Sequence, residues 1–190
     1  MAETKFKFKK CELLPNEGSS LDEAYELLGG GPIVDYYESI DSPTISMNLT
    51  FIDVDQVISR KGIFGGEYVN PTVQVDGYSD FKLTQKKHNL MLNSVRNIIT
   101  ETNKQVATLE FVSVESIINE TARVNKKFTG NVSQTVSELL VSYKKGIQTK
   151  KKLDKHNSAN SYSFVGNLKR PFDTVQWLCP KTQSSSKNFG

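Results

Sequence analysis

The chain has 190 residues, enough for one good hydrophobic core with a small appendage. Its 37% hydrophobic and 24% charged residues are typical of a soluble globular protein and exclude a disordered or fibrous one. No apolar run approaches the ~20 residues that cross a bilayer, and the first residues lack the apolar stretch of a secretory signal. We therefore expect a protein that is made and kept in a cytoplasm, without membrane insertion.

The net charge of +3 is unevenly distributed along the chain. Residues 144–170 hold eight Lys or Arg against one acid, Asp154, whereas the rest holds 16 basic against 20 acidic residues. The sequence therefore predicts a local basic segment and not a generally basic protein. Cys11 and Cys179, far apart in the chain, are expected to be small buried apolar residues rather than a disulfide.

Alternating apolar and polar residues predict the strands. The two clearest are 44–52, with Met47 and Leu49 on one face, and 105–113, with Leu109 and Phe111 on one face. A polar link at 101–104 predicts a hairpin between 89–100 and 105–113. Seven short strands within the first 113 residues favour a barrel or sandwich. The remaining strands are expected at 5–14, 33–40, 68–75 and 81–86.

Few segments have helical signals. Ser20 and Glu23 form a capping box for a helix at 21–28, which Gly29–Pro32 would end. Asn131 caps a second helix over 131–143, whose apolar residues recur on one face and are expected to pack on the sheet. Residues 144–160 are predicted to be an exposed lysine-rich connection, and a short helix is expected at 173–179, stopped by Pro180.

The sequence contains few candidates for catalytic or metal-binding residues. His88 and His156 have no metal-ligand spacing, His88 is expected in a surface turn, and the glycine clusters lack the residues of a phosphate loop. The acids are expected at solvated strand ends and turns rather than as a paired-carboxylate site. We therefore expect no enzyme, no metal and no cofactor. The acids considered are Asp35, Glu38, Asp41, Asp53 and Asp55.

The lysine-rich segment leaves one alternative open. Its cations could neutralise phosphates and give a salt-sensitive affinity for nucleic acid. No aromatic residue is interleaved before Tyr162 and Phe164, so the base-stacking part of a single-strand binder is missing, and a solvated mobile loop is favoured. The lysines concerned are Lys144, Lys145, Lys150, Lys151, Lys152 and Lys155.

Five segments, in this order, carry a resemblance to a known family. They are Tyr36-Tyr-Glu-Ser-Ile-Asp-Ser-Pro-Thr-Ile-Ser-Met-Asn-Leu-Thr-Phe-Ile-Asp53, Gly65-Gly-Glu-Tyr68, Leu109-Glu-Phe-Val-Ser-Val-Glu115, Asn119-Glu-Thr-Ala-Arg-Val-Asn-Lys-Lys-Phe128 and Arg170-Pro-Phe-Asp-Thr-Val-Gln-Trp-Leu178. Together, over roughly residues 33–180, they resemble the N-terminal region of baseplate hub proteins of contractile-tail bacteriophages.

The resemblance implies a fold and an assembly. In that family the first domain is a tail-tube-like β-barrel with a packed helix, and two such barrels per subunit let a trimer imitate the six-fold ring of the tube. Family members are considerably longer than 190 residues. We therefore expect a homotrimer if the chain is an N-terminal part, and a six-fold ring with one barrel per subunit if it is complete.

We thus predict a mainly β chain with some helix: a tail-tube-like antiparallel β-barrel or sandwich with a packed helix over 1–143, a lysine-rich connection over 144–160, and a small α/β C-terminal segment over 161–190. Its expected partners are further copies, the tail tube protein, the central spike protein and other baseplate proteins, within a virion tail baseplate assembled in the bacterial host cytoplasm. DNA would meet it only while passing through the lumen. The candidate ring or lumen contacts are Thr44, Ser46, Asn48, Thr50, Thr108 and Glu110.

Overall fold

A computed structural model describes residues 6–15, 23–75, 81–84, 87–101 and 104–185. The chain divides into two compact units, Met1–Val114 and Glu115–Gly190. This division lies after Val114, ahead of the boundaries expected at residues 143 and 160.

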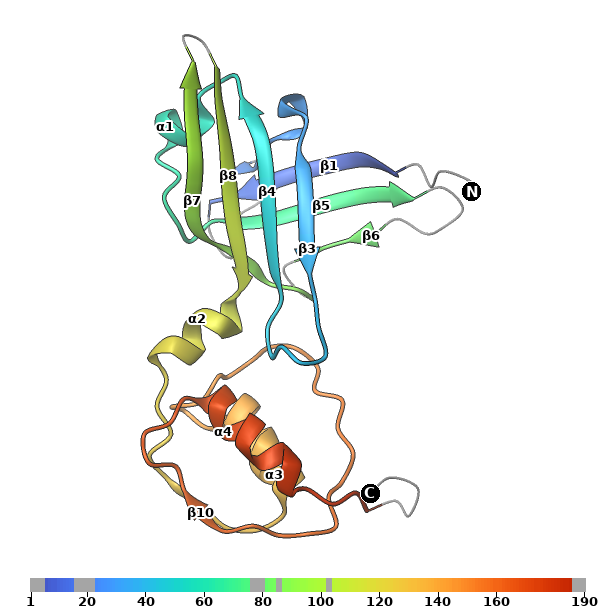
Figure 1. Cartoon of the computed structure of the whole chain (residues 1–190), viewed down its shortest axis with the longest axis vertical. Helices are drawn as coiled ribbons and strands as arrows, with labels where there is room; N and C mark the ends of the chain where they lie inside the picture. Colours follow the sequence, from blue (N-terminus) through green and yellow to red (C-terminus); the bar gives the residue numbers. More distant parts are fainter. Residues whose placement is uncertain (1–5, 16–22, 76–80, 85–86, 102–103, 186–190) are drawn as a thin grey trace. The chain divides into compact units, whose positions relative to one another are not determined.

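The first unit is one antiparallel sheet (Figure 1). Its strands follow the order β2-β1-β5-β7-β8-β4-β3, and β6 pairs with β5. Among the described residues the end strands β2 and β3 do not pair, so the sheet is not a closed barrel. The strands are β1 (Phe6–Leu14), β2 (Tyr25–Glu26), β3 (Ile33–Tyr37), β4 (Ser46–Asp53), β5 (Tyr68–Val75), β6 (Phe81–Lys82), β7 (Leu90–Glu101) and β8 (Lys104–Ser113).

This sheet bends sharply between β5 and β7. The strands β1 and β5 run across the direction of β7, β8, β4 and β3 (Figure 1), and β5 and β7 share the single residue pair Tyr68↔Met91. Both groups of strands contribute to one hydrophobic core, as expected when one face of each layer is apolar. Core side chains include Cys11, Leu13, Val69, Met47, Leu49, Phe51, Leu109 and Phe111.

The chain is mainly β and antiparallel, as predicted, and a strand lies within each of the seven expected ranges. Two are shorter than expected: the strand expected at 33–40 ends at Tyr37, and the one expected at 81–86 ends at Lys82. The predicted alternation holds in detail: β4 and β8 pair from Ser46↔Val112 to Asp53↔Gln105, with every second residue of β8 buried. In the predicted hairpin Glu101 pairs with Lys104. Residues 102–103, together with Lys5 and residues 85–86, lie outside the described residues.

The helix expected at 21–28 is wrong. Ser20, the expected cap, lies outside the described residues; Tyr25–Glu26 form β2 and Leu28–Gly30 form a short 3-10 turn, η2. The Leu27 N–H donates to the Cys11 carbonyl at 2.8 Å, and Glu26 Oε1 accepts from the Cys11 N–H at 3.1 Å. These bonds to β1 outweigh a capping box that could stabilise only two helical turns.

The Asp53 side chain stabilises the start of a helix that the sequence did not predict. Its buried carboxylate accepts from the Val57 N–H at 2.7 Å, the Ile58 N–H at 3.0 Å and Gln105 Nε2 at 2.7 Å. The first two bonds satisfy backbone donors at the start of α1 (Val57–Lys61). Asp53 is therefore a structural capping residue at the end of β4.

The second unit has little regular structure. An aromatic cluster forms its core: the Phe128 and Phe164 rings stack at 5.3 Å, and the Trp177 ring meets Phe164 edge-on at 5.3 Å. Leu139 and Leu178 complete this core. The elements are α2 (Val114–Thr121), β9 (Lys127–Phe128), α3 (Val132–Ser137), the π-helical turn η3 (Glu138–Ser142), β10 (Phe164–Val165), α4 (Pro171–Leu178) and the 3-10 turn η4 (Cys179–Lys181).

The predicted helix at 131–143 is present as α3 and η3. The Asn131 side chain accepts from the Ser133 N–H at 3.0 Å, which confirms the predicted cap. Its apolar face, however, joins the aromatic cluster of the second unit, so its assignment to the first domain needs correction. The later helix α4 starts at Pro171, and Pro180 lies inside η4 instead of ending the helix.

The two cysteines differ from each other. Cys11 is fully buried, as expected, and burial, then Glu26 and Glu12, raises the pKa of its thiol to about 12. Cys179 is exposed, so the prediction that it is buried is wrong. Both are free thiols. No helix in the described part of the chain is long and apolar enough to cross a membrane.

Candidate assembly surface

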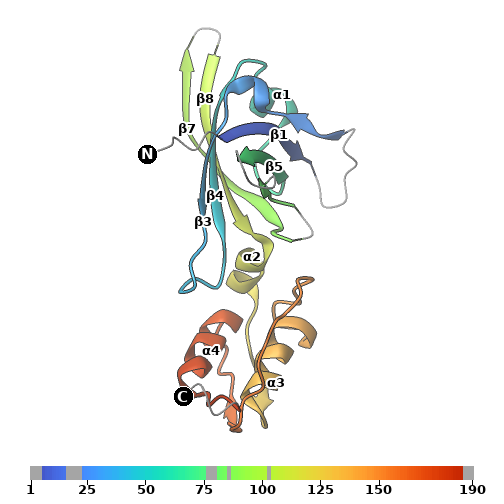
Figure 2. The same cartoon turned by 90° about the vertical axis from the view of Figure 1, so that its right-hand side faces the viewer.

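One face of the first unit's sheet is polar. Because directly opposite residues of antiparallel strands point to the same face, the pairs Asn48↔Glu110 and Thr50↔Thr108 bring four polar side chains of β4 and β8 together. Their neighbours along both strands point into the core. We call this surface of β7, β8, β4 and β3 the polar face; Figure 2 shows these strands after a quarter turn.

Hydrogen bonds link the side chains of the polar face. Thr50 Oγ1 and Thr108 Oγ1 share a bond of 2.9 Å across β4 and β8. The Ser94 hydroxyl donates to Glu110 Oε2 at 2.6 Å, and Arg96 Nε lies 2.8 Å from the same oxygen. The carboxylate of Glu110 is thus neutralised on the face itself, so this central part presents mainly hydroxyl and amide groups.

Five of the six predicted contact residues lie on the polar face: Ser46, Asn48, Thr50, Thr108 and Glu110. Thr44 precedes β4, in the β3–β4 connection, where its carbonyl accepts from Ser42 Oγ. Sequence reasoning missed Ser94 and Arg96, because the β7–β8 pairing contains register shifts that alternation alone does not reveal.

The strand β3 forms one end of the sheet and exposes apolar side chains. Ile33 is 64% exposed and Tyr37 54% exposed, and both lie on the same face of β3 as the exposed Asp35. Their pairing with Thr50 and Ser46 places them at the β3 margin of the polar face. Among the described residues β3 pairs only with β4, so it is an end strand of the sheet. An end strand with exposed apolar side chains is typical of an interaction surface.

The connection from β3 to β4 is an ordered turn. Ser39 Oγ accepts from the Asp41 N–H at 3.2 Å, and the Ser42 N–H donates to the Ser39 carbonyl at 3.2 Å. Tyr36 donates its hydroxyl proton to Glu38 at 3.0 Å. Burial, followed by this hydrogen bond, raises the pKa of Tyr36 to about 12, so the hydroxyl stays protonated and fixes the Glu38 carboxylate.

The predicted basic residues do not form one patch. Lys151 is only partly exposed and pairs with the buried Glu115 at 2.9 Å, while Thr149 donates to the other Glu115 oxygen at 2.7 Å. Lys151 therefore has a structural role. The other five predicted lysines are exposed: Lys144, Lys145, Lys150, Lys152 and Lys155.

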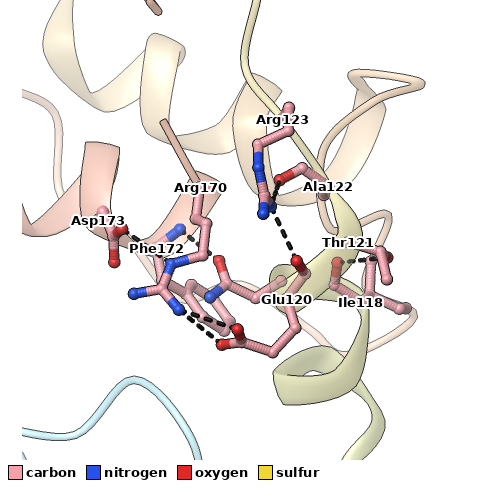
Figure 3. A network of polar contacts seen from close by, with 9 residues as sticks. Ile118, Glu120, Thr121, Ala122, Arg123, Arg170, Phe172 and Asp173 are labelled. Atoms are coloured by element: carbon pink, nitrogen blue, oxygen red, sulfur yellow. Dashed lines mark hydrogen bonds and ion pairs between the residues drawn. The ribbon is translucent and has the colours of Figure 1, made fainter. Parts of the chain in front are cut away.

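Lys144 and Lys145 line a hollow of about 520 Å³ in the second unit together with Arg123. The Arg123 guanidinium donates to the backbone carbonyls of Glu120 at 2.8 Å and Ala122 at 2.7 Å (Figure 3). We call this site the basic hollow. Its apolar lining residues are Ile118, Ala122 and Leu168.

A polar network joins α2 to the start of α4 (Figure 3). Arg170 donates to both Glu120 carboxylate oxygens, at 2.8 and 2.9 Å, and to Asp173 at 2.9 Å. Its hydrogen bonds to Asp173 and Glu120 raise the pKa of Arg170. The buried Asn119 side chain accepts from the Phe172 N–H at 2.9 Å, a backbone donor of the first turn of α4.

No three His, Cys, Asp or Glu residues in the described ranges are grouped to hold a metal ion. His88 lies in the predicted turn, where its Nδ1 accepts from the Thr84 N–H at 3.1 Å.

No protein-family model matches the chain, and no curated protein matches it.

Proposed function

We propose that this chain is a structural subunit of a contractile-tail phage baseplate hub, in which copies form a ring that joins the tail tube to the central spike and leaves a channel for DNA. The observation that carries this proposal is a polar sheet face that ends at the strand β3, whose apolar side chains are exposed. The ordered sequence resemblance to hub proteins supports it as well.

The polar face suits the wall of a DNA channel. Nucleic acid is held mainly by uncompensated Lys and Arg. On the central part of this face Arg96 is already paired with Glu110, and the neighbouring positions are Thr50, Thr108 and Asn48. Such a surface is wetted by water and offers passing phosphates little to hold them. In this role Ser46, Asn48, Thr50, Thr108 and Glu110 would line the channel or contact the next subunit.

The edge strand β3 suits the contact between subunits. Strand pairing across an edge supplies main-chain hydrogen bonds, and exposed side chains such as Tyr37 supply buried area and register. Such pairing would continue the sheet from copy to copy, as in a tube-like barrel ring. On this proposal the expected location is the virion baseplate, after assembly in the host cytoplasm, and the neighbours are the tube and spike proteins.

The particle's mass and symmetry test this proposal. Native mass spectrometry and negative-stain images of the purified chain should show rings of three or six copies. Tyr37→Lys should weaken assembly, whereas Phe64→Lys, which charges an exposed apolar residue outside the sheet strands, should not. A monomer in every condition, alone and with tube and spike proteins, would overturn the assembly role.

A nucleic-acid-binding module is the second candidate, because Arg123, Lys144 and Lys145 lie around one hollow. On that alternative, the six lysines of 144–155 would supply a salt-sensitive affinity. Replacing the exposed Lys144, Lys145, Lys152 and Lys155 with glutamate, while Lys151 keeps its partner Glu115, separates the two candidates. A nucleic-acid binder loses its affinity for DNA, whereas a hub subunit is not expected to bind DNA in the first place.

A further inference from the structure

The two units carry opposite net charges. Residues 1–114 hold 11 Lys or Arg and 16 Asp or Glu, for a net −5, whereas residues 115–190 hold 13 and 5, for a net +8. Charge asymmetry of this size steers molecules into complementary orientations. A second copy of the chain therefore offers each unit a partner of opposite sign.

Most acids of the second unit are already paired inside it. Glu115 pairs with Lys151, Glu120 and Asp173 with Arg170, and Glu138 with Lys126. In the described part of the chain no carboxylate pairs with any cation of the basic hollow, Arg123, Lys144 or Lys145. The positive charge at this hollow is thus not compensated by any described carboxylate of the chain.

Hydrogen bonds to the backbone order the positions from which these cations extend. Arg123 is fixed by two neutral carbonyl acceptors, which position its guanidinium without neutralising it. Lys144 and Lys145 occupy a turn closed by the Gly146 N–H to the Tyr143 carbonyl at 2.8 Å and the Ile147 N–H to the Leu139 carbonyl at 3.1 Å. Positions fixed before binding lower the entropy cost of an ion pair.

The β3–β4 turn of the first unit has the complementary chemistry. We define the acidic tip as residues 38–41. Ile40 is fully exposed at 101% of its reference area, and the exposed acids Glu38 and Asp41 flank it. The hydrogen bonds described above order this turn, so it presents one apolar side chain between two carboxylates on a preorganised backbone.

We propose that the acidic tip of one copy docks in the basic hollow of the next, with Ile40 against Ile118, Ala122 and Leu168. The three cations would then pair with Glu38 and Asp41. This contact is heterologous, so its repetition gives a ring where the rotation between copies closes, and an open filament where it does not. It rests on the proposed assembly role and names the surfaces that join the copies.

A second copy fits the hollow better than nucleic acid does. The lining of the hollow contains no aromatic side chain, so it offers no stacking platform for bases. Its lining combines apolar side chains with three cations, which matches a tip that combines isoleucine with carboxylates. A bare phosphate backbone would leave those apolar side chains exposed to water.

Charge reversal with rescue tests the contact. Self-association of the full chain is measured by sedimentation velocity at low and moderate salt. Lys144→Glu with Lys145→Glu should weaken association by about tenfold or more, and so should Glu38→Lys with Asp41→Lys. All four substitutions in one chain should restore it, because the pairs re-form with reversed sign. Near-ultraviolet circular dichroism verifies that each variant is folded.

Two matched controls separate this contact from general charge effects. Lys152→Glu with Lys155→Glu changes the net charge equally within the same basic segment but outside the hollow, and it should leave association unchanged. Ile40→Ser should weaken association, whereas Phe64→Ser, at another exposed apolar residue, should not.

The outcomes are distinguishable. If rings form and persist unchanged in both charge-reversed variants, the tip–hollow contact is wrong and the assembly role stands. If the wild type never associates, both fall. If the control pair weakens association as much as Lys144→Glu with Lys145→Glu, or if the fourfold variant is not rescued, the specific contact is overturned. Salt-sensitive DNA binding lost in Lys144→Glu with Lys145→Glu, with association unaltered, would assign the hollow to nucleic acid.

Discussion

Different interactions stabilise the two units of this chain. In the first, long strands pair through backbone ladders, and one face of β4 and β8 fills a continuous apolar core. In the second, short helices and loops surround a cluster of aromatic rings, and side chains such as Asn119 and Glu115 supply the bonds that regular structure does not. The structure of the first unit therefore follows from the alternation of neighbouring residues, whereas that of the second depends on contacts between residues far apart in the sequence.

The largest expected difference between the units is in thiol reactivity, since each unit contains one of the two cysteines. Burial raises the pKa of Cys11 from 9.0 to about 12, which lowers its thiolate fraction about a thousandfold below pH 9, and the thiolate is the nucleophile. Cys179 is exposed. A maleimide or disulfide reagent should therefore label Cys179 rapidly and Cys11 only as the first unit unfolds.

Cys179→Ser should remove the fast phase of labelling and leave the slow one. Rapid labelling of the folded Cys179→Ser chain would mean that β1 opens easily and that the core around Cys11 is less protected than its burial indicates.

Each unit has a hydrophobic core of its own, and a truncation in either core should destabilise the chain. Phe111 and Phe128 are both fully buried, one in each unit, and truncation to alanine should cost about 3–5 kcal/mol in either place. Trp177 is the chain's single tryptophan and belongs to the second unit. Its fluorescence therefore follows that unit, while circular dichroism in the far ultraviolet is dominated by the strands of the first.

In urea, Phe111→Ala should shift the dichroism transition and Phe128→Ala the fluorescence transition. Equal shifts of both signals in both variants would show that the units unfold together as one cooperative body. That result would remove the energetic distinction between the two units.

The same contrast explains what the sequence could predict. Strands such as β4 and β8 follow from period-2 alternation, because each side chain's face is set by its immediate neighbours. The cap at Asn131 was equally local. By contrast, β2 depends on bonds from Leu27 and Glu26 to Cys11, which lies 15 residues from Glu26, and no periodic pattern records them.

The helix at 131–143 shows a different limit. Its apolar spacing was enough to place α3 and η3, but an apolar stripe does not say which surface covers it. The partners are Phe128 and Leu178, one on each side of it in the chain. For the candidate surfaces, the alternating pattern of each strand was enough to predict Thr50 and Thr108 as contact residues. The basic hollow, which contains Arg123 and Lys145, depends on how separate loops meet in space and was not predictable from the sequence.

A smaller effect is expected at Lys151, whose partner Glu115 is buried. Lys151→Ala leaves that carboxylate with the Thr149 hydroxyl and should cost about 1–3 kcal/mol, because a buried group then lacks a bond. Lys152→Ala, at the next and exposed position, should change the unfolding free energy by less than about 0.5 kcal/mol. Urea unfolding followed by Trp177 fluorescence measures both; equal effects would show that Glu115 is well solvated.

The smallest effect on stability is expected on the polar face, where Thr50 and Thr108 share a hydrogen bond. Replacing both by valine removes donor and acceptor together and keeps their shape, so the unfolding free energy should change by less than about 1 kcal/mol. The double variant nevertheless turns the centre of the face apolar. If the polarity of this face serves a wet channel and not folding, the variant should keep its unfolding midpoint but form aggregates or altered rings, as judged by light scattering and negative-stain images. A large loss of stability would instead assign these threonines to the fold, and normal rings would remove the face from the channel wall.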